Sequence, residues 1–325
     1  MSTTVAELQR TASPTVRLRI VGAALALAAV AFLTLGVSGN VGFVMELRLP
    51  KVLGMVLVGW ATGIATVPFQ TVTHNRLLTP SIMGLDALYV FLQTLLVLVL
   101  GVGVAATLGA VGMFGINVGL LMLGTVGLIT VLFGRKRRSV HVLVLAGLVL
   151  GAVLRSASTL LQRILDPTTY LVLQGNLFAS FTLISPQLLW VSVGVIAIVS
   201  VWLLRQSATL DVMLLGHDAA VSLGVDYSSF VRKVILASTL LIAVSTALVG
   251  PITFLGLIVA ALAHLVVGTS KHRHLMPMAG LLGAALLVGG QAILEHGLGM
   301  ATVLSVIIEF VGGIVFIWLV VRSSK

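Results

Sequence analysis

Residues 87–134 read ALYVFLQTLLVLVLGVGVAATLGAVGMFGINVGLLMLGTVGLITVLFG, a run of 48 residues without one charged side chain. A helix crosses the hydrocarbon core of a bilayer with about 20 apolar residues. The run is therefore too long for one membrane span and fits two. Glycines are frequent between Gly101 and Gly119, which predicts a hairpin between the two spans.

Charged residues separate further long apolar runs in the same way. Spans are predicted at residues 20–45, 52–73, 140–162, 188–204, 234–249, 253–267, 275–294 and 301–321, which makes ten in total. Lipid offers no hydrogen-bond partner, so spans must be helices or closed barrels, and barrel strands would alternate in polarity. The 34 glycines fit close helix packing in a membrane. The predicted fold is all-α, a polytopic bundle of about ten transmembrane helices in two related halves.

Composition excludes several classes of function. Of the 325 residues, 59% are hydrophobic and 9% are charged, whereas soluble domains carry about 25% charged residues. The absence of cysteine excludes disulfides, iron–sulfur clusters and thiolate metal sites. No lysine follows a glycine, so there is no Walker A sequence, and no H-E-x-x-H occurs. No catalytic residue, metal site or cofactor is predicted.

The net charge of +10 reflects topology rather than nucleic-acid binding. With ten spans and both termini in the cytoplasm, 15 of the 19 basic residues lie inside, as the positive-inside rule requires. Residues 1–19 then form a cytoplasmic N-terminal segment, and residues 20–325 form a single transmembrane domain. The basic run at residues 135–138 is expected to touch anionic lipid. His272 and His274 are expected to be solvated anchors rather than a metal pair.

Residues 205–233 form the most polar connection, with a short helical pattern at residues 210–225. Insertion into a bilayer does not require such a helix. This helix indicates either contact with a cytoplasmic partner or a surface loop that links two halves. Composition alone favours neither interpretation.

Few ionisable residues lie at membrane depth, where they are candidates for function. They are Asp86, Arg155, His264, Glu295 and Glu309. Arg155 and Glu309 are expected deepest, either lining a pathway or pairing across helices, and Asp86 is expected near the cytoplasmic face. A carrier driven by protons or sodium usually has more acidic residues, so their scarcity argues against one.

Five stretches, in order, resemble the permease subunits of ABC importers for iron–siderophore complexes and vitamin B12. The stretches are RLPKVLGMVLVG (residues 48–59), FQTVTHNRLLTPSIMGLD (69–86), LVLAGLVLG (143–151), LLGHDAAVSLGV (214–225) and GPITFLGLIVAALAHLVVG (250–268). The chain departs from the family pattern at Arg76, at Ala260 and Ala261, and at His264. THNRLLTPSIMGLD together with TVLSVIIEFVGG resembles the branch that handles catecholate siderophores.

The resemblance implies a multi-pass permease in the bacterial cytoplasmic membrane. Two permeases, identical or paired, would form the pore. Two cytoplasmic ATP-binding subunits and an extracytoplasmic substrate-binding protein would complete an importer that moves a ferric siderophore by alternating access. ATP would be bound by the partner subunit. The alternatives are an ion-coupled secondary carrier that acts without an ATPase, and a membrane scaffold or receptor.

The resemblance also assigns roles to residues. Coupling to the ATPase falls to Gly216, Asp218, Ala219, Ala220, Leu223 and Gly224. Docking of the binding protein falls to Arg48 and Lys51, whose alternative role is snorkelling to the membrane interface. The cytoplasmic gate contains Leu77, Ser139, Val140 and His141, for which ordinary loop packing is the alternative. Candidates to line the pathway are Gln70, Asn75, Arg155 and Glu309.

Overall fold

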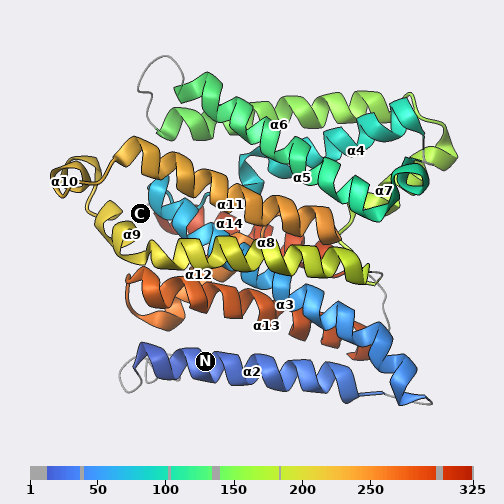
Figure 1. Cartoon of the computed structure of the whole chain (residues 1–325), viewed down its shortest axis with the longest axis horizontal. Helices are drawn as coiled ribbons and strands as arrows, with labels where there is room; N and C mark the ends of the chain where they lie inside the picture. Colours follow the sequence, from blue (N-terminus) through green and yellow to red (C-terminus); the bar gives the residue numbers. More distant parts are fainter. Residues whose placement is uncertain are drawn as a thin grey trace.

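Every regular element in the described part of the chain is a helix. The computed structural model describes residues 13–36, 40–101, 104–133, 140–182, 184–297 and 303–323. Its helices lie side by side along one long axis (Figure 1). They are α2 (Pro14–Thr34), α3 (Val41–Val72), the π-helix η1 (Ser81–Leu85), α4 (Asp86–Leu100), α5 (Val104–Phe133), α6 (Val140–Gln162), α7 (Pro167–Leu177), α8 (Pro186–Arg205), α9 (Ser207–Met213), α10 (His217–Ser222), α11 (Tyr227–Val249), α12 (Leu255–Val267), α13 (His272–Gly297) and α14 (Leu304–Ser323).

The predicted all-helical membrane bundle is confirmed. Within the described ranges, eight helices are long and apolar enough to cross a membrane, and α12 and α14 supply two shorter apolar helices. These elements lie at the ten predicted spans. The predicted hairpin is present too, because α4 ends at Gly101 and the chain bends again at Gly109 within α5. The expectation of two related halves stays a prediction.

The predicted boundary of the first span is wrong. Helix α2 ends at Thr34, and α3 begins at Val41, so residues 48–51 lie inside α3 and not between spans. The side chain of Asn40 causes this start, because it accepts hydrogen bonds from the amides of Gly42 (3.0 Å) and Phe43 (3.4 Å). The 32-residue α3 continues through Pro50 and Pro68. Helix α7 was not predicted.

Helix α3 is the centre of the bundle, and it packs backbone to backbone on α13. A Cβ atom built on Gly63 would lie 2.3 Å from the carbonyl of Ala279, and one on Gly59 would lie 2.3 Å from the amide nitrogen of Ala284. Small residues at a membrane helix crossing allow this approach, and close packing replaces the missing hydrophobic force between helices. The α3–α13 pair therefore forms the rigid part of the structure.

Two interruptions of the helices lie inside the bundle. Gly84, with φ +106°, bends the chain within η1, and its Cα lies close to Gly151 of α6. Gly250, with φ +100°, separates α11 from α12 and packs against Ala179. An L side chain would be strained at both positions and would also clash. Backbone carbonyls freed by such breaks need partners inside a membrane protein.

Replacing Gly63 by alanine should destabilise the bundle, because the added methyl group meets backbone that cannot move aside. Overpacking of this kind costs about 1–3 kcal/mol. Gly194 on the exposed face of α8 has no atom within 4 Å of the built Cβ, so Gly194→Ala should be neutral or slightly stabilising. Thermal unfolding in detergent compares the two, and equal melting temperatures would contradict the close crossing.

Candidate functional site

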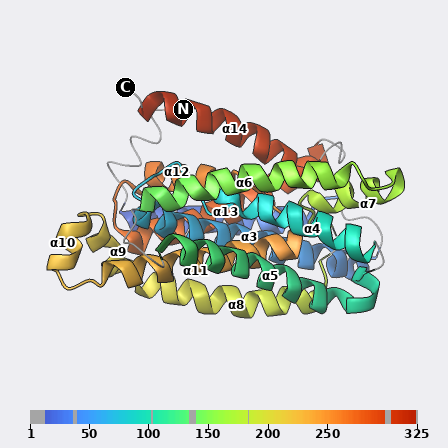
Figure 2. The same ribbon diagram turned by 90° about the horizontal axis from the view of Figure 1, so that it is seen from above.

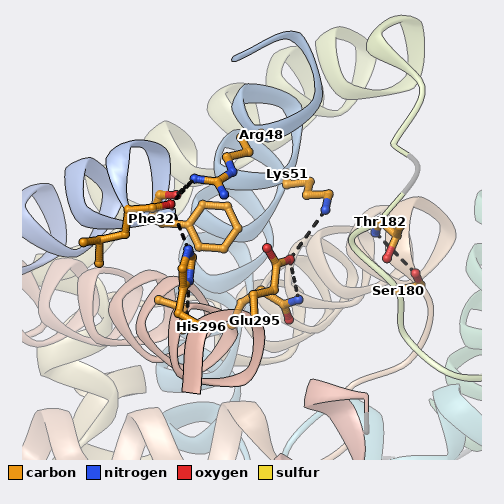
Figure 3. Close-up of polar contacts among 10 residues, drawn as sticks. Phe32, Arg48, Lys51, Ser180, Thr182, Glu295 and His296 are labelled. Carbon is orange, nitrogen blue, oxygen red and sulfur yellow. Dashed lines mark hydrogen bonds and ion pairs between the residues drawn. The ribbon is translucent and has the colours of Figure 1, made fainter. Parts of the chain in front are cut away.

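The side chain of Arg48, a residue of α3, caps the C-terminal end of helix α2 and does not project freely into solvent. Its Nη1 donates hydrogen bonds to the carbonyl oxygens of Phe32 (2.9 Å), Leu33 (3.3 Å) and Leu35 (2.7 Å), as Figure 3 shows in part. The guanidinium also lies 5.8 Å from the centre of the Phe32 ring. The last carbonyls of a helix have no partner within the helix, and a basic side chain satisfies them and the negative end of the helix dipole.

Lys51, the second predicted docking residue, is also engaged within the chain. Its Nζ lies 3.5 Å from Oε1 of Glu295, and the two side chains are 17% and 15% exposed. The same oxygen accepts a hydrogen bond from Gln291 at 3.0 Å. The ring of His296 contacts the carbonyl of Leu35 at 3.0 Å. Arg48, Lys51, Glu295 and His296 thus form one polar cluster at the α2–α3 junction (Figure 3), and docking by Arg48 and Lys51 stays a prediction.

Other charged side chains at the same end of the bundle are exposed. They include Glu46, Arg163 and Asp166. Asp166 caps α7, and its carboxylate accepts hydrogen bonds from the Thr168 hydroxyl and from the Thr169 amide at 2.9 Å. These bonds hold the pKa of Asp166 well below its usual range.

At the opposite end, the turn after α3 borders a cavity. This cavity of about 330 Å³ lies between α3, α12 and α14, and its lining includes Gln70, Leu77 and His264. Gln70 donates a hydrogen bond to the carbonyl of Arg76 at 2.6 Å. Asn75 accepts one from the amide of Leu77 at 2.9 Å, so Asn75 shapes the turn. The structure therefore groups Gln70, Asn75 and Leu77.

The other predicted gate residues cannot be placed beside them. Ser139 lies outside the described residues. Val140 and His141 begin α6, but their side chains are outside the described part. The gate formed by all four residues stays a prediction.

Helices α9 and α10 project from one end of the bundle (Figures 1 and 2). We call them, with the turns at Gly216 and Gly224, the coupling segment. Its surface carries apolar side chains: Leu215 is 64% exposed and Leu223 is 63% exposed. Asp218 is also exposed, and Gly216 and Gly224 have φ of +96° and +86°.

The predicted contact of Ala220 with the ATPase is not supported by its position in the structure. Its side chain is fully buried in the core of its own chain, so it cannot contact a partner directly. The small side chain instead allows α10 to seat on the bundle. The leucines of the coupling segment, which point outward, replace Ala220 as the contact candidates.

The prediction that His272 is a solvated anchor is wrong. His272 is 1% exposed. Its Nδ1 lies 2.6 Å from Oδ1 of Asp211 in α9, and its Nε2 lies 2.7 Å from the hydroxyl of Thr71 in α3. These contacts link the coupling segment to α13 and to the end of α3. Asp211 and Thr71 lie 61 and 201 residues away from His272, so no local motif signals the link.

A second contact joins the same two regions. His74, at positive φ in the turn after α3, lies 3.0 Å from the Tyr227 hydroxyl. The Tyr227 ring packs edge-on against His217 of α10, with centroids 4.6 Å apart. Through both contacts, the turn that carries Leu77 is attached to the coupling segment.

Arg155 and Glu309 are exposed on α6 and α14, two helices on the same side of the bundle (Figure 2). Both lie within apolar helices. Charged side chains are costly against lipid and face a bundle interior or a water-filled cavity. The role of Arg155 and Glu309 in lining a pathway stays a prediction. Asp86, by contrast, is 6% exposed and lies within the bundle.

Comparison with known proteins agrees with this geometry. Residues 30–322 match the FecCD transport family. The chain is 39% identical to the petrobactin import system permease protein YclO of Bacillus subtilis, over 88% of this chain and 91% of the relative. It is 32% identical to the petrobactin import system permease protein FatC of Bacillus anthracis, over 86% and 79%. It is 29% identical to the vitamin B12 import system permease protein BtuC of Klebsiella pneumoniae, over 86% and 83%.

A solved structure shares the architecture. A metal-chelate type ABC transporter in an inward-facing conformation superposes with a TM-score of 0.81 at 25% sequence identity, covering 95% of this chain and all of the other. The chain therefore belongs to the FecCD transport family and is a permease subunit of an ABC importer of the siderophore and vitamin B12 type.

Proposed function

We propose that this permease imports a ferric catecholate siderophore by alternating access. The observation that carries the proposal is the 39% identity to a petrobactin permease along nearly the whole of both chains. Petrobactin is a catecholate siderophore. The vitamin B12 permeases are less similar, at 29% identity or near it.

The exposed Arg155 supplies chemistry that suits such a substrate. Catecholate oxygens bound to ferric iron carry negative charge, and the guanidinium donates hydrogen bonds to anionic oxygens in a fixed planar array. Arg155 lies on the face of α6 that we assign to the pathway. Glu309 on α14 has the opposite charge and limits how strongly an anion is held there.

Replacing Arg155 by glutamine should reduce uptake of the ferric catecholate. A hydrogen bond to a charged group contributes about 1.5–3 kcal/mol, which corresponds to a fall of about 10- to 100-fold. Uptake would be measured in a host whose own permease is deleted, with radioiron as ferric petrobactin or a ferric hydroxamate and with radiocobalt as cobalamin. Arg163→Gln at the exposed end of α6 is the control and should keep normal uptake. Equal uptake of all three substrates would contradict the catecholate assignment.

The coupling segment is the surface that we assign to the ATPase partner. Its exposed leucines form an apolar knob, and an interface of this kind depends on a few buried anchors. The alternative of a secondary carrier that acts alone loses its support, because the chain is an ABC permease subunit. A second permease and a substrate-binding protein complete the proposed importer, as they do for ABC importers generally.

Leu223→Glu should release the ATPase while the bundle still folds. A charge placed in an apolar contact that costs about 2 kcal/mol would weaken association about 30-fold. Co-purification of the ATPase with the tagged permease provides the measurement. Leu171→Glu is the matched control, because Leu171 is 69% exposed in α7 at the other end of the bundle. Unchanged recovery with Leu223→Glu would identify the segment as a linker.

We also propose that the coupling segment and both termini are cytoplasmic. The chain has no cysteine, so a single introduced cysteine is a unique label. In intact cells, Ser222→Cys in α10 should be protected from an impermeant maleimide, and Thr168→Cys in α7 should react. The reverse pattern would invert the proposed orientation.

A further inference from the structure

Asp86 is a buried acid without a described partner. It begins α4 and is 6% exposed. Among the described residues, neither of its carboxylate oxygens has a hydrogen-bond partner of acceptable geometry, and it forms no ion pair. An ionised carboxylate is costly to bury without compensation, so Asp86 either carries a proton or needs a positive partner that the described side chains do not supply.

The groups around Asp86 are mostly neutral oxygens. The hydroxyls of Thr253 and Ser81 lie beside the carboxylate. The charged groups that act on it are Glu309, which repels it, and Arg155, whose attraction is the weaker of the two. Arg155 is itself exposed on α6. The protein therefore provides little positive charge for this acid.

A small cavity adjoins the side chain of Ser81. Its volume of about 10 Å³ is lined by Ser81, Thr62, Ser245 and Thr246, together with Gly250 and Ile252 at the α11–α12 break. That space holds about one water-sized sphere. Thr62 donates its proton to the carbonyl of Val58 and Ser245 donates to that of Leu241, each at 2.8 Å. With these protons committed, the two oxygens offer lone pairs, which suit a cation.

The backbone conformation near Asp86 also favours a cation site. A π-turn and a broken helix meet here, at η1 and at the turn between α11 and α12. Such interruptions occur at functional sites, and in membrane transporters their freed carbonyls coordinate small cations.

We propose that Asp86, the hydroxyls of Ser81 and Thr253, and the adjacent hydroxyl-lined cavity form a binding site for one sodium ion. One carboxylate and several neutral oxygens match a single positive charge, whereas calcium and magnesium sites use more oxygen ligands or several waters. A space for about one water-sized sphere admits a single small monovalent cation. The ion would tie η1 to the α11–α12 break and to α3. The site does not depend on which siderophore is carried.

Sodium should stabilise the full-length permease in lipid nanodiscs. When sodium chloride replaces choline chloride at constant ionic strength, the melting temperature should rise and saturate. The expected shift is about 2–4 °C, the size that a modest stabilisation gives in domains of 150–250 residues. Radioactive sodium should bind at one ion per chain.

Variants separate this site from a general salt effect. Asp86→Asn keeps the shape and should abolish both the shift and the bound sodium. Glu46→Gln removes an exposed acid near the start of α3 and should keep both. If Asp86→Asn fails to fold, Ser81→Ala and Thr62→Val should each weaken sodium binding. Equal melting in sodium and choline, or sodium binding that survives Asp86→Asn, would overturn the proposal.

Discussion

The bilayer requires every backbone polar group to find its partner inside the protein, and the rest of this structure depends on that requirement. Where helices run unbroken, the requirement is met within each helix. Where they end, side chains meet it: Arg48 caps α2, and Arg17 donates to the carbonyls of Val266 (3.0 Å) and Val267 (2.6 Å) at the end of α12. These caps attach α2 at both of its ends to other helices.

The interruptions of the helices coincide with the places assigned to function. The turn after α3 borders the cavity with Leu77, and His272 connects α3 and α13 to Asp211 in the coupling segment. The break between α11 and α12 faces Asp86 through Thr253. The closely packed α3–α13 pair adjoins these places through Thr71 and His272.

The sequence predicts the bundle well because lipid makes the apolar, charge-free runs unambiguous. The sequence does not predict the α2–α3 boundary. Residues 20–45 contain no charge that would separate two helices, and the only local indication of the new helix start is the single capping residue Asn40. It places Ala220 in a helix but cannot tell which face is buried. His272 and Asp211 meet only in three dimensions, and the KHRH stretch alone reads as solvated. Asp86 was expected near the cytoplasmic face, and the sequence alone does not show that it is buried within the bundle.

Whether the exposed face of α6 borders a water-filled pathway or lipid can be measured by cysteine accessibility. Ala152 lies on this face, one helical turn before Arg155, and Ile198 is a 73% exposed residue of α8. In proteoliposomes that contain the assembled importer, Ala152→Cys should react with an impermeant thiol reagent from one side without ATP and from the other side with ATP bound. Ile198→Cys should stay unreactive. If Ala152→Cys is as unreactive as Ile198→Cys in both states, α6 faces lipid, and neither the pathway nor alternating access along it is as described.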